Sequence, residues 1–204
     1  TVSNGLATVT NGTLATPGDF NKLGAGTLAL LGAAQVGNNA VIDAGTLLVE
    51  GTVSAAGSLT VGNTNSGIAM VISNGGHVAS AFSVFVGYAA TASNNRVLVT
   101  GENSVWTNGN SGYGNRLFFG YEGGGNSLVI ADGAKVTEGY AYVGYSNSSS
   151  QNSVEVTGGG SLWTNISSLT IGYRGSSNSL VISNGGIVAN TDGTIGSVAS
   201  SSNN

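Results

Sequence analysis

The side chains of this sequence that could take part in acid–base chemistry are its carboxylates and a single histidine. Hydrolysis of a glycosidic bond needs two carboxyl groups about 5–10 Å apart. Glu102 and Asp132 lie in turns that follow neighbouring predicted strands, but only one repeat has an acid at each of these places, and most of the acids have the position of a solitary turn residue or an outward strand residue. The sequence therefore predicts no catalytic residues. The nine acids never form an Asp-x-Asp or Asp-Asp pair: Asp19, Asp43, Glu50, Glu102, Glu122, Asp132, Glu138, Glu155 and Asp192.

Metal and cofactor chemistry has equally few candidates. The chain has no Cys and one His, which argues against zinc–thiolate sites and a His-rich metal centre. That residue, His77, follows a Gly-Gly pair and is interpreted as a surface turn residue. The five Lys and Arg residues are too few and too scattered to neutralise a nucleic-acid backbone. We expect no metal, no cofactor, no nucleic-acid partner and no membrane insertion by this segment, which lacks a run of 18 apolar residues.

The aromatic residues are better candidates for binding, because they recur at fixed places. The pattern apolar-x-apolar-Gly, often followed by Tyr, occurs six times from Val61-Gly62 to Ile195-Gly196, at spacings of 24 to 33 residues. In an extended strand the middle residue of this pattern points away from its two apolar neighbours. Two exterior aromatic columns are thus predicted, one within the strand and one after the Gly: Phe85, Phe118 and Tyr142, and then Tyr88, Tyr121, Tyr145 and Tyr173.

A third outward column is predicted in the next strand of each repeat, and it is mostly apolar. This candidate packing face contains Val71, Leu98, Val129 and Val181, with Glu155 between the last two. Soluble monomers rarely leave a large contiguous apolar patch uncovered. Three interpretations of the exterior columns remain open: ladders of like residues that stabilise strand stacking, lateral packing against another copy or a surface partner, and aromatic platforms for sugar rings.

The repeats also define the fold. Only 7% of the residues are charged, 35 of the 204 are Gly and 40% are hydrophobic, a composition that suits short strands joined by tight turns. The strands alternate with period two, as in Val154-Glu155-Val156, and turns such as Asn184-Gly185-Gly186 follow them. Three short strands in about 25 residues close one coil of a parallel β-helix. We predict one continuous all-β solenoid of about eight coils over residues 1–204, irregular over 1–57 and with alternating repeats of 24–33 residues over 58–204.

Alignment of the repeats also suggests what fills the interior. Trp106 and Trp163 occupy equivalent places in the long repeats and are interpreted as core or corner residues. Four Asn residues lie two positions before an apolar strand: Asn95, Asn126, Asn152 and Asn178. They would form either an interior ladder of axial amide hydrogen bonds or a row of solvated turn residues. The sequence does not decide between these two.

Two sets of segments resemble a known family. N-K-L-G-A-G-T-L-A-L-L-G at 21–32, continuing to V-I-D-A-G-T-L-L-V-E-G at 41–51, is similar to the passenger-associated transport repeat of bacterial autotransporters. The later N-S-L-V-I-S-N-G-G-I-V, V-G-Y and G-S-L-W-T-N segments are similar to Gly/Asn-rich repeats of large autotransporter-like surface proteins. The resemblance implies a right-handed, single-stranded parallel β-helix from a passenger domain. It also implies an extracellular location at the bacterial cell surface, with outer-membrane association through regions not in this chain.

The function expected from these observations is structural. The chain would be a non-enzymatic, adhesive β-helix segment of an autotransporter-like surface protein, a stiff rod that presents a binding surface to a host or cell-surface glycan or protein. The alternative is a repeating subunit of an extracellular filament or sheath, assembled from copies of itself by end-to-end and lateral packing, because neither end carries a polar capping helix. A polysaccharide-active enzyme is a third interpretation and lacks a plausible set of catalytic groups.

Overall fold

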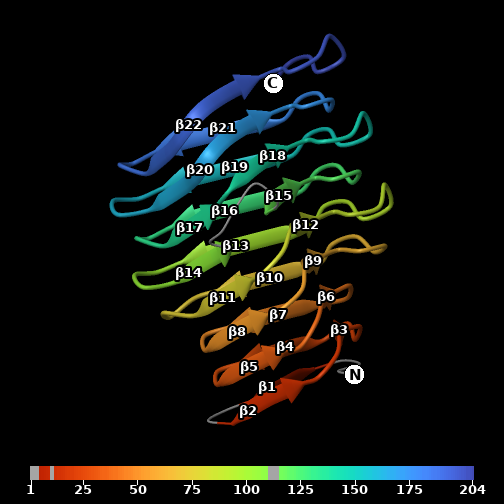
Figure 1. Cartoon of the computed structure of the whole chain (residues 1–204), viewed down its shortest axis with the longest axis vertical. Coiled ribbons are helices and arrows are strands. Elements are labelled where there is room, and N and C mark those ends of the chain that lie inside the picture. The colour runs from red at the N-terminus through yellow and green to blue at the C-terminus, as the bar shows by residue number, and fades with distance from the viewer. Residues whose placement is uncertain (1–4, 10–11, 110–114) are drawn as a thin grey trace.

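Short parallel strands in register build the whole structure. The computed structural model describes residues 5–9, 12–109 and 115–204, and every regular element within these ranges is a β-strand. Figure 1 shows the strands stacked as successive rungs along the long axis, from the N-terminal rungs in red to the C-terminal rungs in blue. The predicted all-β parallel β-helix is therefore confirmed. The described residues contain no helix that could cross a membrane.

The first sheet takes one strand from each rung. All of its pairs are parallel and in continuous register. Its eight strands agree with the number of coils expected from the repeats. Their hydrogen-bonded order is β1 (Leu6–Val9), β4 (Thr27–Leu30), β7 (Thr46–Val49), β10 (Ala69–Ile72), β13 (Arg96–Thr100), β16 (Ser127–Ala131), β19 (Ser153–Thr157) and β21 (Ser179–Ser183).

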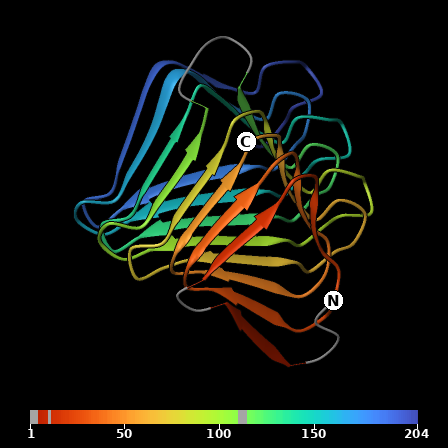
Figure 2. The same cartoon turned by 60° about the horizontal axis from the view of Figure 1, so that its bottom comes forward.

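The second sheet holds the remaining strands in two arms. The arms join because β20 (Leu162–Ile171) and β22 (Ile187–Ile195) each extend across both. In Figure 2 the strands of the two sheets lie on different sides of a common interior. One arm contains β2 (Thr13–Thr16), β5 (Ala33–Val36), β8 (Thr52–Ala55), β11 (His77–Ser80), β14 (Val105–Asn108) and β17 (Lys135–Glu138), and the other contains β3 (Phe20–Lys22), β6 (Ala40–Ile42), β9 (Leu59–Val61), β12 (Val84–Val86), β15 (Arg116–Phe119) and β18 (Tyr140–Val143).

The N-terminal segment, predicted to be irregular, adds rungs of the same kind with shorter turns. Strand β4 pairs with β1 on one side and with β7 on the other, and β7 pairs with β10 without a break in register. The variation among repeats therefore lies mainly in turn length, and the one break in register among these pairs is between Asn165 and Ser168, where β20 pairs with β22.

Alternate residues of each strand fill the interior. Trp106 and Trp163 are both fully buried, which confirms their predicted core position. Burial of such side chains stabilises the fold by about 25 cal/mol for each Å² of apolar surface removed from water. The prediction for His77 was wrong: it is an outward residue of β11, paired with Thr52 and Val105, because the preceding turn ends at Gly76.

The four aligned Asn residues form the interior ladder. Each side-chain Nδ2 donates to the Oδ1 of the Asn one rung later, at 2.9 Å from Asn95 to Asn126, 2.8 Å from Asn126 to Asn152 and 2.9 Å from Asn152 to Asn178. The same Oδ1 atoms also accept the backbone N–H of the preceding Asn, at 3.0 Å in each of these three steps. The four side chains are at most 1% exposed. The interior alternative is therefore confirmed, and it extends through Asn178 to Asn204 at 3.0 Å.

This Asn ladder explains the Gly of the repeated pattern. Gly87 and Gly120 end their strands with φ of 66° and 75°, a conformation that favours glycine. A Cβ atom added to Gly87 would lie 2.6 Å from Nδ2 of Asn126, and one added to Gly120 would collide in the same way with Asn152. The Gly residues thus let the next rung's amide pack against the backbone. They also direct the chain into the turns that carry the tyrosines.

Replacing Asn126 by Ala should lower the free energy of unfolding by about 3 kcal/mol, because two buried N–H donors of Asn95 lose their acceptor and Asn152 loses a donor. The measurement is equilibrium denaturation. The matched control is Asn147→Ala, at an exposed turn position, which should change stability by less than about 0.5 kcal/mol. Equal effects of the two substitutions would contradict a structural role for the ladder.

Candidate functional site

The two predicted aromatic columns are present and adjoin each other. Phe85, Phe118 and Tyr142 are paired in register on β12, β15 and β18. Their rings stack with centroid distances of 5.2 and 5.5 Å and interplanar angles of 8° and 12°. The second column lies on the turns that follow these strands and is stacked at 5.1–5.3 Å and 10–13°. We call these seven rings the aromatic ladder: Phe85, Phe118, Tyr142, Tyr88, Tyr121, Tyr145 and Tyr173.

Contacts between the columns close the aromatic ladder into one unit. Phe85 meets Tyr88 edge-to-face at 5.2 Å and 90°, and Phe118 meets Tyr145 at 4.9 Å and 79°. At the last ring, the guanidinium of Arg174 lies over Tyr173, 5.7 Å from the ring centroid. Such aromatic pairs contribute about 0.5–1.5 kcal/mol each beyond the area that they bury. The aromatic ladder therefore stabilises the stacking of rungs on the outside, opposite to the Asn ladder inside.

The orientation of the rings limits what the aromatic ladder can bind. Because each ring stacks on rings in neighbouring rungs, most ring faces are covered and the ring edges remain outward. Phe118 is only 6% exposed, whereas Tyr88 at one end is 42% exposed. A sugar platform needs a free aromatic face, so this geometry favours hydrogen bonding by tyrosine hydroxyls over stacking of sugars. Binding by these residues stays a prediction.

The tyrosine hydroxyls of this column can donate and accept hydrogen bonds. Burial raises the pKa of Tyr121 above its ordinary value, and the proximity of Tyr145, Tyr88 and Glu122 raises it further, since each would repel a phenolate. The turns around this column also supply polar groups. A hollow there is lined by Ala90, Ser93, Asn94, Gly124, Gly125, Ser148, Ser150 and Gln151.

The third predicted column is also present, on the outer face of the first sheet. Val71, Leu98 and Val129 are paired in register on β10, β13 and β16, and Glu155 and Val181 continue the column on β19 and β21. The first three are half-buried, and Val181 is 49% exposed. Leu48 on β7 extends it by one rung. We call this column the apolar stripe; a partner for it stays a prediction.

The acids do not assemble into a recognisable catalytic group within the described residues. Glu102 and Asp132 are exposed on adjoining turns, and Oδ2 of Asp132 accepts a hydrogen bond from Thr100 at 2.7 Å. Neither lines the hollows that we describe. No group of three or more His, Asp or Glu residues is placed to hold a metal ion in the ranges 5–9, 12–109 and 115–204.

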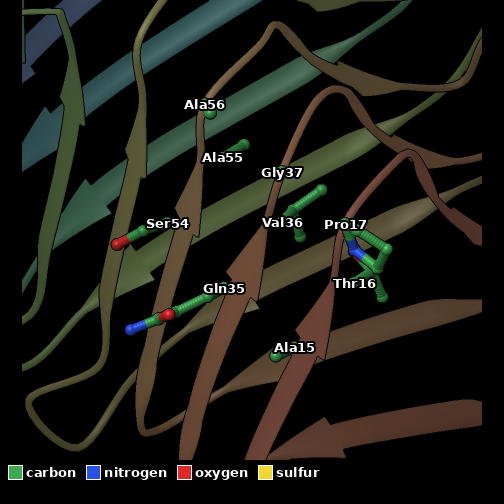
Figure 3. Close-up of a pocket in the computed structure, with 9 residues that line it drawn as sticks. All are labelled: Ala15, Thr16, Pro17, Gln35, Val36, Gly37, Ser54, Ala55 and Ala56. Carbon is green, nitrogen blue, oxygen red and sulfur yellow. The ribbon is translucent and has the colours of Figure 1, made fainter.

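The hollow in Figure 3 runs along the outside of the N-terminal rungs, where β2, β5 and β8 end. Its side chains are small and uncharged, and Gln35 is the longest polar group in it. Such a lining contains no charged or titratable side chain that could bind an ion or transfer a proton. The residues are Ala15, Thr16, Pro17, Gln35, Val36, Gly37, Ser54, Ala55 and Ala56.

Asp43 is not the solitary turn residue that the sequence suggested. It is 6% exposed and occupies the place of the repeat Gly after Ile42. Its Oδ1 accepts backbone N–H groups from Asn63, Thr64 and Asn65 at 2.7, 2.9 and 3.0 Å. Burial alone would raise the pKa of Asp43, but these hydrogen bonds and that of the Thr64 hydroxyl hold it below its ordinary value. The carboxylate therefore ties one turn to the next where the Asn ladder is absent.

Glu138 also departs from the turn or outward position expected of most acids, because it is fully buried. It ends β17 in an inward column between Asn108 on β14 and Asn165 on β20. Burial raises the pKa of Glu138 well above its ordinary value, and the Asn108 side chain partly opposes this by favouring the charged form. The signal in the sequence was the alignment of Thr137-Glu138 with the Thr-Asn pairs of the long repeats.

The comparisons with known proteins identify no relative. No family of proteins, no curated protein and no solved structure matches this chain. The similarity to autotransporter passenger repeats therefore stays a prediction.

Replacing Glu138 by Gln should stabilise the protein increasingly as pH rises. The folded state holds the proton of Glu138 above the ordinary pKa of 4.5, so the free energy of unfolding is highest below pH 4.5 and falls as pH rises towards the raised pKa. Within that window the stability difference between the variant and the parent protein should grow by about 1.4 kcal/mol per pH unit. Denaturation from pH 4 upwards measures it, and parallel stability profiles would refute a buried, proton-holding Glu138.

Replacing Phe118 by Ala should lower the free energy of unfolding by about 3 kcal/mol, because the ring stacks on Phe85 and Tyr142 and is largely buried. Phe82→Ala is the matched control, since Phe82 is 59% exposed and outside the aromatic ladder. It should cost less than about 1 kcal/mol. Thermal and chemical denaturation compare the two, and a Phe118→Ala protein as stable as the control would show that the aromatic ladder contributes no stability.

Proposed function

We propose that this chain is a non-enzymatic structural segment of an extracellular, autotransporter-like bacterial surface protein, a stiff rod that presents a binding surface. The observation that carries the proposal is the axial bonding between rungs. Strand pairing, the Asn ladder and the aromatic ladder all run in the same direction along the molecule. To bend such a rod, rungs about 4.8 Å apart must separate on one side, which strains all three sets of contacts at once.

The binding surface proposed for this rod is the line of turns that carries Tyr88, Tyr121, Tyr145 and Tyr173. Turns on a rigid scaffold are where recognition residues concentrate. The same turns also carry hydroxyl and amide groups, including Asn94, Ser148 and Gln151, which line a hollow. These groups suit hydrogen bonding to the hydroxyls of a host or cell-surface glycan, or to a polar protein surface. The scattered acids support a role in binding without turnover.

The test is binding of the purified chain to immobilised glycans and matrix proteins, with product release assayed in parallel. Tyr145→Phe should weaken binding about fivefold, the loss of one hydrogen bond, while it keeps the ring stacked on Tyr121 and Tyr173. Ser127→Ala, on the outer face of the first sheet, is the control and should leave affinity unchanged. Release of product from any polysaccharide would overturn the non-enzymatic role, and full affinity of Tyr145→Phe would remove this surface from the proposal.

The second candidate function is a repeating subunit of an extracellular filament or sheath. The apolar stripe favours it, because an exterior row of Val and Leu is unusual on a surface exposed to water. Electron microscopy over a concentration series tests this candidate directly. Polymers that grow with concentration would support it, and discrete particles at every concentration would count against it.

A further inference from the structure

The outer face of the first sheet combines an apolar centre with two isolated charges. The apolar stripe runs along its middle, and the neighbouring outward positions are small, such as Ala69, Ser127 and Ser153. The two charges are Arg96 on β13 and Glu155 on β19, exposed and half-buried respectively. Within the described residues no hydrogen bond or ion pair engages either side chain.

The two rungs that carry these charges lie symmetrically on either side of one strand. Strand β16 pairs with β13 on one side and with β19 on the other. Along the strand direction Arg96 is level with Ser127 of β16, whereas Glu155 is level with Val129, two residues further on. A two-fold rotation about an axis along β16 exchanges these two rungs. It would therefore bring the Arg96 rung of one copy opposite the Glu155 rung of another.

We propose that this face packs against the same face of a second copy, with the two rods antiparallel and the two-fold axis along β16. In this arrangement Val129 faces its own counterpart, Val71 faces Val181, and Leu98 faces the aliphatic part of Glu155. Arg96 then lies one outward position from Glu155 of the second copy, on the order of 7 Å along the strand. A long Arg side chain spans that separation, and two equivalent ion pairs form.

The charges also exclude the simplest competing arrangement. If the rods were parallel, with the two-fold axis along the rod, each rung would face the same rung of the other copy. Glu155 would then oppose Glu155 across an apolar contact, and like charges directly opposite each other are destabilising. Arg96 would lie at the far edge of the face and could not compensate. The complementary placement of Arg96 and Glu155 therefore selects the antiparallel pair.

The expected association is weak. Five rungs from β10 to β21 extend over roughly 20–25 Å, and the outward width of the strands is roughly 15 Å. A contact of that size falls in the range of transient complexes, well below the roughly 1,600 Å² of total buried surface in a typical stable one. The small residues beside the apolar stripe, such as Ser127 and Ser153, allow close packing, as in dry interfaces between sheets. The proposal deepens the structural role proposed above and does not depend on the tyrosine surface.

Cysteine cross-linking is the sharpest test, because the chain has no Cys and each variant carries a single thiol. Ser127→Cys on β16 lies at the proposed axis, so a short bismaleimide should join two copies there. Leu98→Cys on β13 should not cross-link to itself, since it faces the Glu155 rung, but should cross-link to Glu155→Cys in a mixture. Thr137→Cys, an outward residue of β17 in the second sheet, measures random collision.

We expect Ser127→Cys to give at least fivefold more covalent dimer than Thr137→Cys. Efficient self-linking of Leu98→Cys would instead show the parallel arrangement and overturn the proposal. Equal yields from Ser127→Cys and Thr137→Cys would show that this face does not pair at all. In either case the tyrosine binding test remains valid, so failure of the pairing is distinguishable from failure of the proposed function.

Charge reversal tests the ion pair separately from the apolar contact. In the Ser127→Cys background, Arg96→Glu should lower the dimer yield about fivefold by placing two acids in facing rungs. Adding Glu155→Arg should restore the yield, because it recreates the pair with the charges exchanged. Both positions are outward, so the rungs should fold alike, which circular dichroism verifies. A double variant that stays as weak as the single one would refute the proposed apposition.

Discussion

The structure depends on one constraint: successive rungs must stack in register, so that each side chain meets its counterpart in the next rung. Buried Asn amides show why this constraint is strict. The Oδ1 of Asn126 accepts two N–H groups from Asn95, and its Nδ2 donates to Asn152. An interior amide is satisfied only when both neighbouring rungs are in register, and an unsatisfied buried amide costs about 1–3 kcal/mol. In the Asn ladder, register and polar satisfaction are therefore the same requirement.

The exterior follows from this interior arrangement. The Asn amide packs where a Cβ of Gly87 or Gly120 would otherwise lie, so the strand must end in Gly. Although the turns differ in length, each begins at a Gly with a similar positive φ, 66–77° from Gly87 to Gly172. A Tyr directly after that Gly consequently stacks on the Tyr of the next rung, as Tyr88 does on Tyr121. The inner Asn ladder and the outer aromatic ladder are thus two results of one Gly conformation.

The sequence predicted the features that repeat and missed those that occur once. Strand alternation and the spacing of the Gly pattern were enough to predict the parallel β-helix, the aromatic columns and the apolar stripe. They could not decide whether Asn126 is buried, because a solvated turn residue has the same spacing. Most of the acids were expected at turn or outward positions, and Asp43 and Glu138 depart from this. Asp43 accepts backbone N–H groups from the next rung, and Glu138 is enclosed between the strands of neighbouring rungs, arrangements that no local pattern contains.

The inward column of Ser80, Asn108, Glu138 and Asn165 shows how rungs of similar sequence remain distinct. At the same position the earlier rungs have Val36 and Ala55, which are apolar. A chain that slipped by one whole rung would place Ser80 at an apolar level and leave Glu138 beside a different set of partners. Buried polar groups cost stability compared with apolar ones. The hydrophobic residues of the rungs are similar enough to exchange places. A buried polar residue at the wrong level would destabilise the slipped arrangement, so the polar column favours a single register for this repetitive chain.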